Sequence, residues 1–215
     1  MAWMALVPGC GSAKLPPMRS LFLIGDSISV DYGPFLAAAI APWFSYARKS
    51  GEDLARANLD VAAGANGGDS RAVLAYLRAR AAAGGFRPEV LLVNAGLHDV
   101  KTTAAGLQVS LAEYRTNLAG IAALAKELGS RLVWVRTTHL DDRIHNAKTG
   151  LGFTRHQADV DACNAAADEV LAALPRIDLH GFSRTFTDPF RDHVHFREGL
   201  PAQQAAFLAG ALTQL

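Results

Sequence analysis

Short runs of apolar residues alternate along the chain with longer stretches in which apolar residues recur at helical spacing. The short runs are typical of strands that are buried on both faces of a parallel sheet, and the longer stretches predict helices that cover the sheet. Strands are predicted at residues 20–24, 90–93 and 132–135, with weaker candidates at 43–47, 59–62 and 176–179. Helices are predicted at residues 28–40, 71–82, 107–128, 156–174 and 201–212.

This alternation of strands and helices indicates right-handed crossovers and an α/β fold. We expect three layers, α/β/α, around a central parallel sheet of about five strands. A chain of 215 residues suits one domain with a substantial core. Because no internal repeat, low-complexity tract or linker is visible, residues 18–215 are predicted to form a single domain.

The first seventeen residues stand apart from this pattern. They hold a short apolar stretch followed by Gly9-Cys10-Gly11-Ser12, which is faintly similar to a secretion or lipoprotein signal. No Lys or Arg precedes that stretch, and it is shorter than the core of a usual signal. We expect residues 1–17 to be a disordered leader, or the result of a start codon placed too early. A cytoplasmic location is therefore favoured, with export as the alternative if the leader is a signal.

Composition narrows the classes of partner. The 21 basic residues are matched by 20 acidic ones, so no global positive field exists to bind nucleic acid. No apolar run approaches the roughly 20 residues that span a bilayer. The two cysteines, Cys10 and Cys163, predict neither a disulfide framework nor a zinc cluster. A small neutral substrate and no cofactor are expected, and the oligomeric state is not predicted.

The first candidate for chemistry is Gly25-Asp26-Ser27, where a predicted strand ends and a helix begins. A serine at a helix N-terminus lies near unpaired backbone N–H groups, which favour the negative charge that forms when its hydroxyl attacks a carbonyl. Gly, Asp and Ser are also ordinary turn and N-cap residues. The segment lacks the Gly-x-Ser-x-Gly pattern of the α/β-hydrolases, so that family is disfavoured.

The second candidate is Asp192-His193-Val194-His195, just before the last predicted helix. A hydroxyl nucleophile needs a base, and that base needs an acceptor to fix its tautomer. Asp192 and His195, three residues apart, supply both, although His193 competes for the role of base. Two histidines at i and i+2 also allow a metal site, but no third or fourth ligand stands at a recognisable spacing. No metal site is therefore predicted.

Two further segments contain groups that can stabilise an oxyanion. Gly68 follows a predicted strand and opens a helix, so its N–H can point at a ligand, although the surrounding glycines also fit a flexible turn. His98 follows the strand at 90–93 and can donate a hydrogen bond, although a lone histidine there is often structural. All four segments fall at the C-terminal ends of strands, where open α/β sheets bind ligands.

These segments, in this order, resemble the four blocks of the SGNH hydrolase superfamily, also called GDSL esterases, over residues 18–215. The resemblance implies that Ser27 attacks, His195 is the base and Asp192 orients it. It also implies an oxyanion hole made of the Ser27 N–H, the Gly68 N–H and the side chain of His98. The third block usually holds Asn where this chain has His98, and Gly-Leu-His-Asp is similar to one branch of the superfamily.

The resemblance implies a serine ester hydrolase that acts on short-chain acyl esters, most of all O-acetyl groups on carbohydrates. Two alternatives stay open at this stage. A lipid esterase, lysophospholipase or thioesterase predicts an apolar channel near Ile28, Tyr32 and Phe35, and a catalytically silent carbohydrate-binding domain keeps the fold without turnover. The long polar loop at 138–152 contains groups that could bind sugar hydroxyls.

Overall fold

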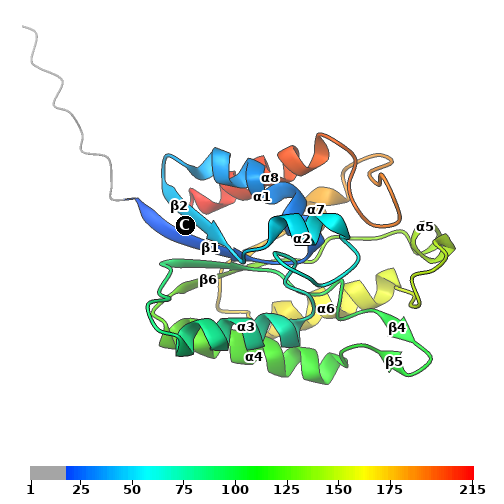
Figure 1. The fold of residues 1–215 in the computed structure, drawn as a ribbon, viewed down its shortest axis with the longest axis horizontal. Coiled ribbons are helices and arrows are strands. Elements are labelled where there is room, and N and C mark those ends of the chain that lie inside the picture. The colour runs from blue at the N-terminus through cyan, green and yellow to red at the C-terminus, as the bar shows by residue number, and fades with distance from the viewer. Residues whose placement is uncertain (1–17) are drawn as a thin grey trace, which may run out of the picture.

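A five-stranded parallel sheet runs through the centre of the molecule (Figure 1). The computed structural model describes residues 18–215. The strand order is β2-β1-β3-β6-β7, so the chain starts near one edge and then crosses the sheet in the other direction. The strands of this sheet are β1 (Arg19–Ile24), β2 (Phe44–Arg48), β3 (Val90–Val93), β6 (Arg131–Val135) and β7 (Arg176–Ile177).

The three inner strands form the core because they are apolar on both faces. Every residue of β3 is buried, and so are the last four residues of β1 and of β6. Parallel strands covered by helices on both sides need such continuous apolar runs. These are also the three strands that the sequence predicts most strongly, and the prediction of a parallel sheet of about five strands is confirmed.

Helices cover both faces of the sheet. The helices α1 and α8 pack against each other on one face, while α3, α4 and α6 form the layer on the other (Figure 1). Short helices lie in the connections that reach the C-terminal edge of the strands. The helices are α1 (Ser27–Ile40), α2 (Glu52–Ala57), α3 (Ser70–Ala82), α4 (Leu111–Glu127), α5 (Asp142–Ala147), α6 (Gln157–Val170), α7 (Leu179–Ser183) and α8 (Leu200–Leu212).

The structure corrects three of the predicted elements. The predicted helix at 156–174 ends at Val170, and residues 171–174 form turns. No strand forms at residues 59–62, which are turns and irregular backbone. The predicted helix at 107–128 begins only at Leu111, because the Ser110 side chain accepts a hydrogen bond from the N–H of Glu113 and caps the helix there. Residues before Ser110 instead form a small antiparallel hairpin, β4 (Thr102–Thr103) with β5 (Gly106–Leu107).

The predicted leader, residues 1–17, lies outside the described residues, and Cys10 lies there too. Within residues 18–215, Cys163 is buried as a free thiol in α6. No helix in this part of the chain is long and apolar enough to cross a membrane.

Candidate active site

Ser27 is the first residue of α1, directly after the end of β1. The Asp26 side chain caps the helix by accepting a hydrogen bond from the N–H of Ile28 at 3.0 Å. Gly25 is required in the turn, since a Cβ there would lie 2.9 Å from the Cβ of Ser29. The tight turn and the cap place Ser27 in the first turn of the helix, where backbone N–H groups have no intrahelical acceptor.

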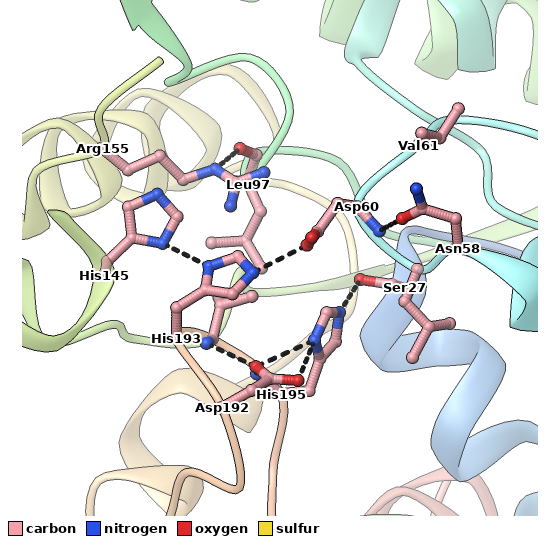
Figure 2. Close-up of polar contacts among 12 residues, drawn as sticks. Ser27, Asn58, Asp60, Val61, Leu97, His145, Arg155, Asp192, His193 and His195 are labelled. Carbon is pink, nitrogen blue, oxygen red and sulfur yellow. Dashed lines mark hydrogen bonds and ion pairs between the residues drawn. The ribbon is translucent and has the colours of Figure 1, made fainter. Parts of the chain in front are cut away.

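Ser27, His195 and Asp192 form one continuous chain of hydrogen-bonding contacts (Figure 2). The Oγ atom of Ser27 lies 2.9 Å from Nε2 of His195. The other ring nitrogen of His195, Nδ1, lies 2.9 Å from Oδ2 of Asp192 and 3.0 Å from Oδ1. Ser27 and His195 are almost fully buried, so the hydroxyl and the imidazole meet with little competition from water. This geometry suits transfer of the serine proton to His195.

Asp192 is held in place by the loop that it belongs to. Its Oδ1 atom accepts hydrogen bonds from the N–H groups of Val194 at 2.9 Å and His195 at 2.8 Å. Partial burial raises the pKa of Asp192, but the bonds from His195 and from these two N–H groups outweigh burial and hold the pKa below its usual range. The carboxylate is therefore ionised at neutral pH and stabilises a protonated His195.

His193, the competing candidate for the base, contacts Asp60 and His145 instead of Ser27. Its Nε2 atom lies 2.8 Å from Oδ1 of Asp60, and its Nδ1 atom lies 2.9 Å from Nδ1 of His145 (Figure 2). Both ring nitrogens of His193 are thus engaged, and His195 is the histidine that contacts Ser27. Sequence reasoning assigned no role to Asp60, because it lies 133 residues from His193 in the chain.

Gly68 lies in a loop that is tied to the turn before Ser27. The N–H of the preceding residue, Gly67, donates to the carbonyl of Gly25 at 2.7 Å. Gly68 has a φ of 75°, which favours glycine, and a Cβ there would lie 3.0 Å from that of Ala62. Its N–H donates to Oδ1 of Asn66 at 3.0 Å. The structure therefore brings the loop of Gly68 against the turn before Ser27, and the Gly68 N–H has a partner within its own loop.

His98 is buried directly beyond the end of β3. Its Nδ1 atom has no hydrogen-bond partner among the residues that the structure describes. Burial, together with the positive charges of Lys101 and Arg155, holds the pKa of His98 well below its usual value. The ring is neutral at pH 7, so it carries one N–H donor and one free lone pair. A neutral imidazole can still donate one hydrogen bond to an oxyanion.

Asp99 connects the segment of His98 to the segment of Gly68, a role that sequence reasoning did not assign. Its two carboxylate oxygens lie 2.9 and 3.1 Å from the backbone nitrogen of Ser70, the first residue of α3. Burial raises the pKa of Asp99 to about 7, although the bonds from Ser70 act in the opposite direction. The sequence did contain a signal for Asp99, because this residue directly follows His98 and ends the Gly-Leu-His-Asp block.

The raised pKa of Asp99 predicts a specific effect of pH on stability. A folded-state pKa above the unfolded value means that the native protein binds the proton more tightly, so this group lowers stability as the pH rises from about 4 to 7. Asp99→Asn keeps an oxygen for the Ser70 N–H and removes the titration. Urea unfolding measures the free energy of unfolding at pH 5 and at pH 8. Between these pH values the parent should lose more of this free energy than Asp99→Asn does, by on the order of 2 kcal/mol. Equal losses would contradict the assignment.

Arg155 is another buried residue that the sequence did not single out. Its Nε atom donates to the carbonyl oxygen of Leu97 at 2.6 Å, which ties the segment after the 138–152 loop to the segment of His98 (Figure 2). Burial lowers the pKa of Arg155 to about 10, so the side chain remains charged at neutral pH. Within the loop, α5 carries His145, which is fully buried against His193.

A groove of about 520 Å³ opens beside the loop of Asp192. Most of its lining is apolar and includes Phe35 and two prolines, and charged side chains and Gly199 complete it. Arg191, which precedes Asp192, contacts Asp31 in this groove at 2.9 Å. Ile28 and Tyr32, by contrast, are buried in the core and do not line it. The charged lining residues are Asp31, Arg56, Arg191 and Glu198.

The sequence matches no protein-family model and no curated protein. Solved structures do match over almost the whole chain. A GDSL-like lipase from Bacteroides thetaiotaomicron superposes with a TM-score of 0.63 at 14% identity, covering 92% of this chain and 89% of that one. The chain has the SGNH hydrolase fold.

Two further neighbours extend this comparison. TesA has a TM-score of 0.63 at 16% identity, with 91% of this chain and 99% of that one covered. An acetyl xylan esterase, AlAXEase, has a TM-score of 0.62 at 14% identity, with coverages of 91% and 98%. The similarity to the SGNH hydrolase fold therefore extends over more than nine tenths of the chain.

Proposed function

We propose that the protein is a serine ester hydrolase in which Ser27 is the nucleophile, His195 the general base and Asp192 the group that orients His195. The observation that carries the proposal is the unbroken chain of contacts from Ser27 Oγ through His195 to Asp192 at the C-terminal edge of the sheet. Neighbours with the same fold are named as esterases and lipases, which supports the same class of reaction.

The reaction follows from the order of these contacts. Ser27 Oγ forms a bond to the ester carbonyl carbon while its proton passes to Nε2 of His195. The carbonyl oxygen becomes an oxyanion, and the protonated His195 then gives the proton to the leaving alcohol as the ester bond breaks. Water, deprotonated by His195, then attacks the acyl-enzyme; as the bond between the acyl carbon and Ser27 Oγ breaks, His195 returns the proton to Oγ and the acid is released. Asp192 stays ionised throughout and stabilises the charged ring.

The oxyanion needs donors, and we assign the N–H of Ser27, the N–H of Gly68 and the ring N–H of His98. Ser27 supplies a backbone N–H of the first helical turn, at the positive end of the α1 dipole. The Gly68 N–H must leave Asn66 or share its hydrogen between Asn66 and the oxyanion when substrate binds. Hydrogen bonds in apo sites often reach their final form only in the complex.

The His98 assignment predicts a loss of rate that is large but incomplete. Removing one oxyanion donor typically costs about 10²–10³ in kcat. His98→Ala should show that loss, while His98→Asn, which supplies a carboxamide N–H, should stay within about tenfold of the parent. Initial rates at saturating substrate measure both. Unchanged turnover in His98→Ala would remove His98 from the mechanism.

For the substrate, we infer a short-chain acyl ester, with O-acetyl groups on carbohydrates as the preferred class. The groove beside Asp192 has a mainly apolar lining, and the four charged side chains along it can hydrogen-bond sugar hydroxyls. A structural neighbour is named as an acetyl xylan esterase. The lipid alternative predicts an apolar channel near Ile28, Tyr32 and Phe35. Ile28 and Tyr32 are buried in the core, whereas Phe35 is exposed and lines the groove, so the acyl chain length must be decided by experiment.

A series of p-nitrophenyl esters tests the reaction and the acyl chain length together. Acetate, butyrate and octanoate are compared in the parent and in Ser27→Ala, with acetylated xylan oligosaccharides assayed in parallel. Rates that fall with chain length and vanish in Ser27→Ala are expected. A preference for octanoate would favour the lipid or thioester alternative, and sugar binding without hydrolysis in the parent would favour the silent carbohydrate-binding domain.

A further inference from the structure

Asp60, His193 and His195 converge beside Ser27 from two distant parts of the chain (Figure 2). Each offers one ligand atom, a carboxylate oxygen or a ring nitrogen, and these three atoms lie within 4.8 Å of one another. The closest pair is Oδ1 of Asp60 and Nε2 of His193, at 2.8 Å. Both histidine side chains are only 3% exposed. The sequence showed only the two histidines, and the fold adds the third group.

Both histidines are oriented from behind by a further side chain. Nδ1 of His195 lies 2.9 Å from Asp192, and Nδ1 of His193 lies 2.9 Å from Nδ1 of His145. Metal-binding histidines have this feature, because a partner on the second ring nitrogen fixes the tautomer and the direction of the lone pair. In each ring Nε2 is the nitrogen that faces the shared space: that of His193 lies beside Asp60, and that of His195 lies beside Ser27 Oγ.

We propose that Asp60, His193 and His195 form a Zn²⁺ site, and that an ion bound there switches the hydrolase off by occupying Nε2 of His195. The inhibition, though not the binding, rests on the proposed function. Two imidazoles, one carboxylate and an open fourth position form a donor set that zinc prefers. Tetrahedral zinc places its ligand atoms about 3.3 Å apart, so modest side-chain rotations close the site around the ion.

Neighbouring charges set the strength of this binding. Lys101 donates to the carbonyl oxygen of Asp60 at 3.3 Å, and the charge of Arg155 also acts on Asp60. These two cations repel a Zn²⁺ ion at Asp60. We therefore expect reversible binding that is weaker than in a structural zinc site. Mg²⁺ prefers six oxygen ligands and is not expected to bind.

Binding is tested in tag-free Ser27→Ala, which keeps all three ligands and does not turn over substrate. Zn²⁺ is titrated at fixed pH against a chromophoric chelator, and one equivalent should bind. Asp60→Asn and His193→Gln in the same background should each weaken binding at least tenfold, since even the loss of an outer-shell partner typically costs about 10–100-fold. The matched control is His156→Gln, because His156 forms an exposed pair with Asp142 at 3.1 Å that has no third ligand within residues 18–215. It should bind Zn²⁺ as Ser27→Ala does.

Inhibition is tested in the parent with p-nitrophenyl acetate. Zn²⁺ should lower the initial rate with a midpoint that matches the binding constant, EDTA should restore the rate, and Mg²⁺ should have no effect. Asp60→Asn and His193→Gln should move the midpoint to higher Zn²⁺ in proportion to their binding defects, with each variant normalised to its own metal-free rate.

The binding titration and the inhibition assay can fail independently of each other. Binding in Ser27→Ala that needs millimolar Zn²⁺, or that Asp60→Asn and His193→Gln leave unchanged, would overturn the site. Site-specific binding without inhibition of the parent would overturn the switch. If the metal-free parent hydrolyses no ester, the proposed function fails, and the binding titration still decides whether the Zn²⁺ site exists.

Discussion

Ser27→Ala should lower kcat for p-nitrophenyl acetate by a factor of about 10⁴ or more, because it removes the hydroxyl that lies 2.9 Å from Nε2 of His195. The substitution removes one buried oxygen atom from the side chain of Ser27. Because this changes the packed volume little, the protein should stay folded. Steady-state rates measure the loss, with circular dichroism as a check on the fold.

The matched control for this variant is Ser45→Ala. Ser45 is an exposed serine on the edge strand β2, away from the proposed chemistry. Its replacement should leave kcat unchanged. If Ser27→Ala retained more than a tenth of the parent rate, another group would have to be the nucleophile.

Asp192→Asn should lower kcat by about 10³–10⁴ while leaving the fold intact. The asparagine keeps an oxygen for the N–H groups of Val194 and His195, which Asp192 accepts at 2.9 and 2.8 Å. It removes the charge that stabilises protonated His195, and its amide N–H₂ favours the tautomer with the proton on Nε2. In that tautomer His195 cannot accept the proton of Ser27.

Asp188→Asn is the control for the second variant, because Asp188 lies in the same loop as an exposed acid paired with Arg197. Its kcat should stay within about twofold of the parent, since an exposed ion pair contributes little. A similar loss in both variants would mean that the charge of the loop matters and not the contact with His195. Near-parent activity in Asp192→Asn would contradict the assigned role.

The sheet and the main helices could be predicted because their signals are local. The runs at 90–93 and 132–135 are apolar on both faces, and such short runs between helices are typical of buried parallel strands. The weaker signal at 59–62 was wrong, because Leu59 and Val61 lie in turns around Asn66 instead of in a ladder. Apolar residues in a loop that packs on the domain cannot be told from a short strand by pattern alone.

The residues of the site also fall into two groups, those with a local signal in the sequence and those without one. Asp192 and His195 are three residues apart, and Ser27 stands at a strand end, so spacing and position brought them forward. Asp60 and Arg155 could not be found like this, because their partners, His193 and Leu97, lie far away in the sequence. Only the fold brings such residues together. The Asn66 contact of Gly68 is likewise a matter of loop conformation that no motif specifies.

The most direct test of the account is covalent labelling of the parent with a fluorophosphonate ester, which phosphonylates an activated serine and mimics the tetrahedral intermediate. Intact mass and peptide mapping should find one adduct per chain, on Ser27, with loss of esterase activity in proportion to labelling and no adduct in Ser27→Ala. An adduct on another residue, or full activity in a protein fully labelled at Ser27, would contradict the assignment of Ser27 as the nucleophile.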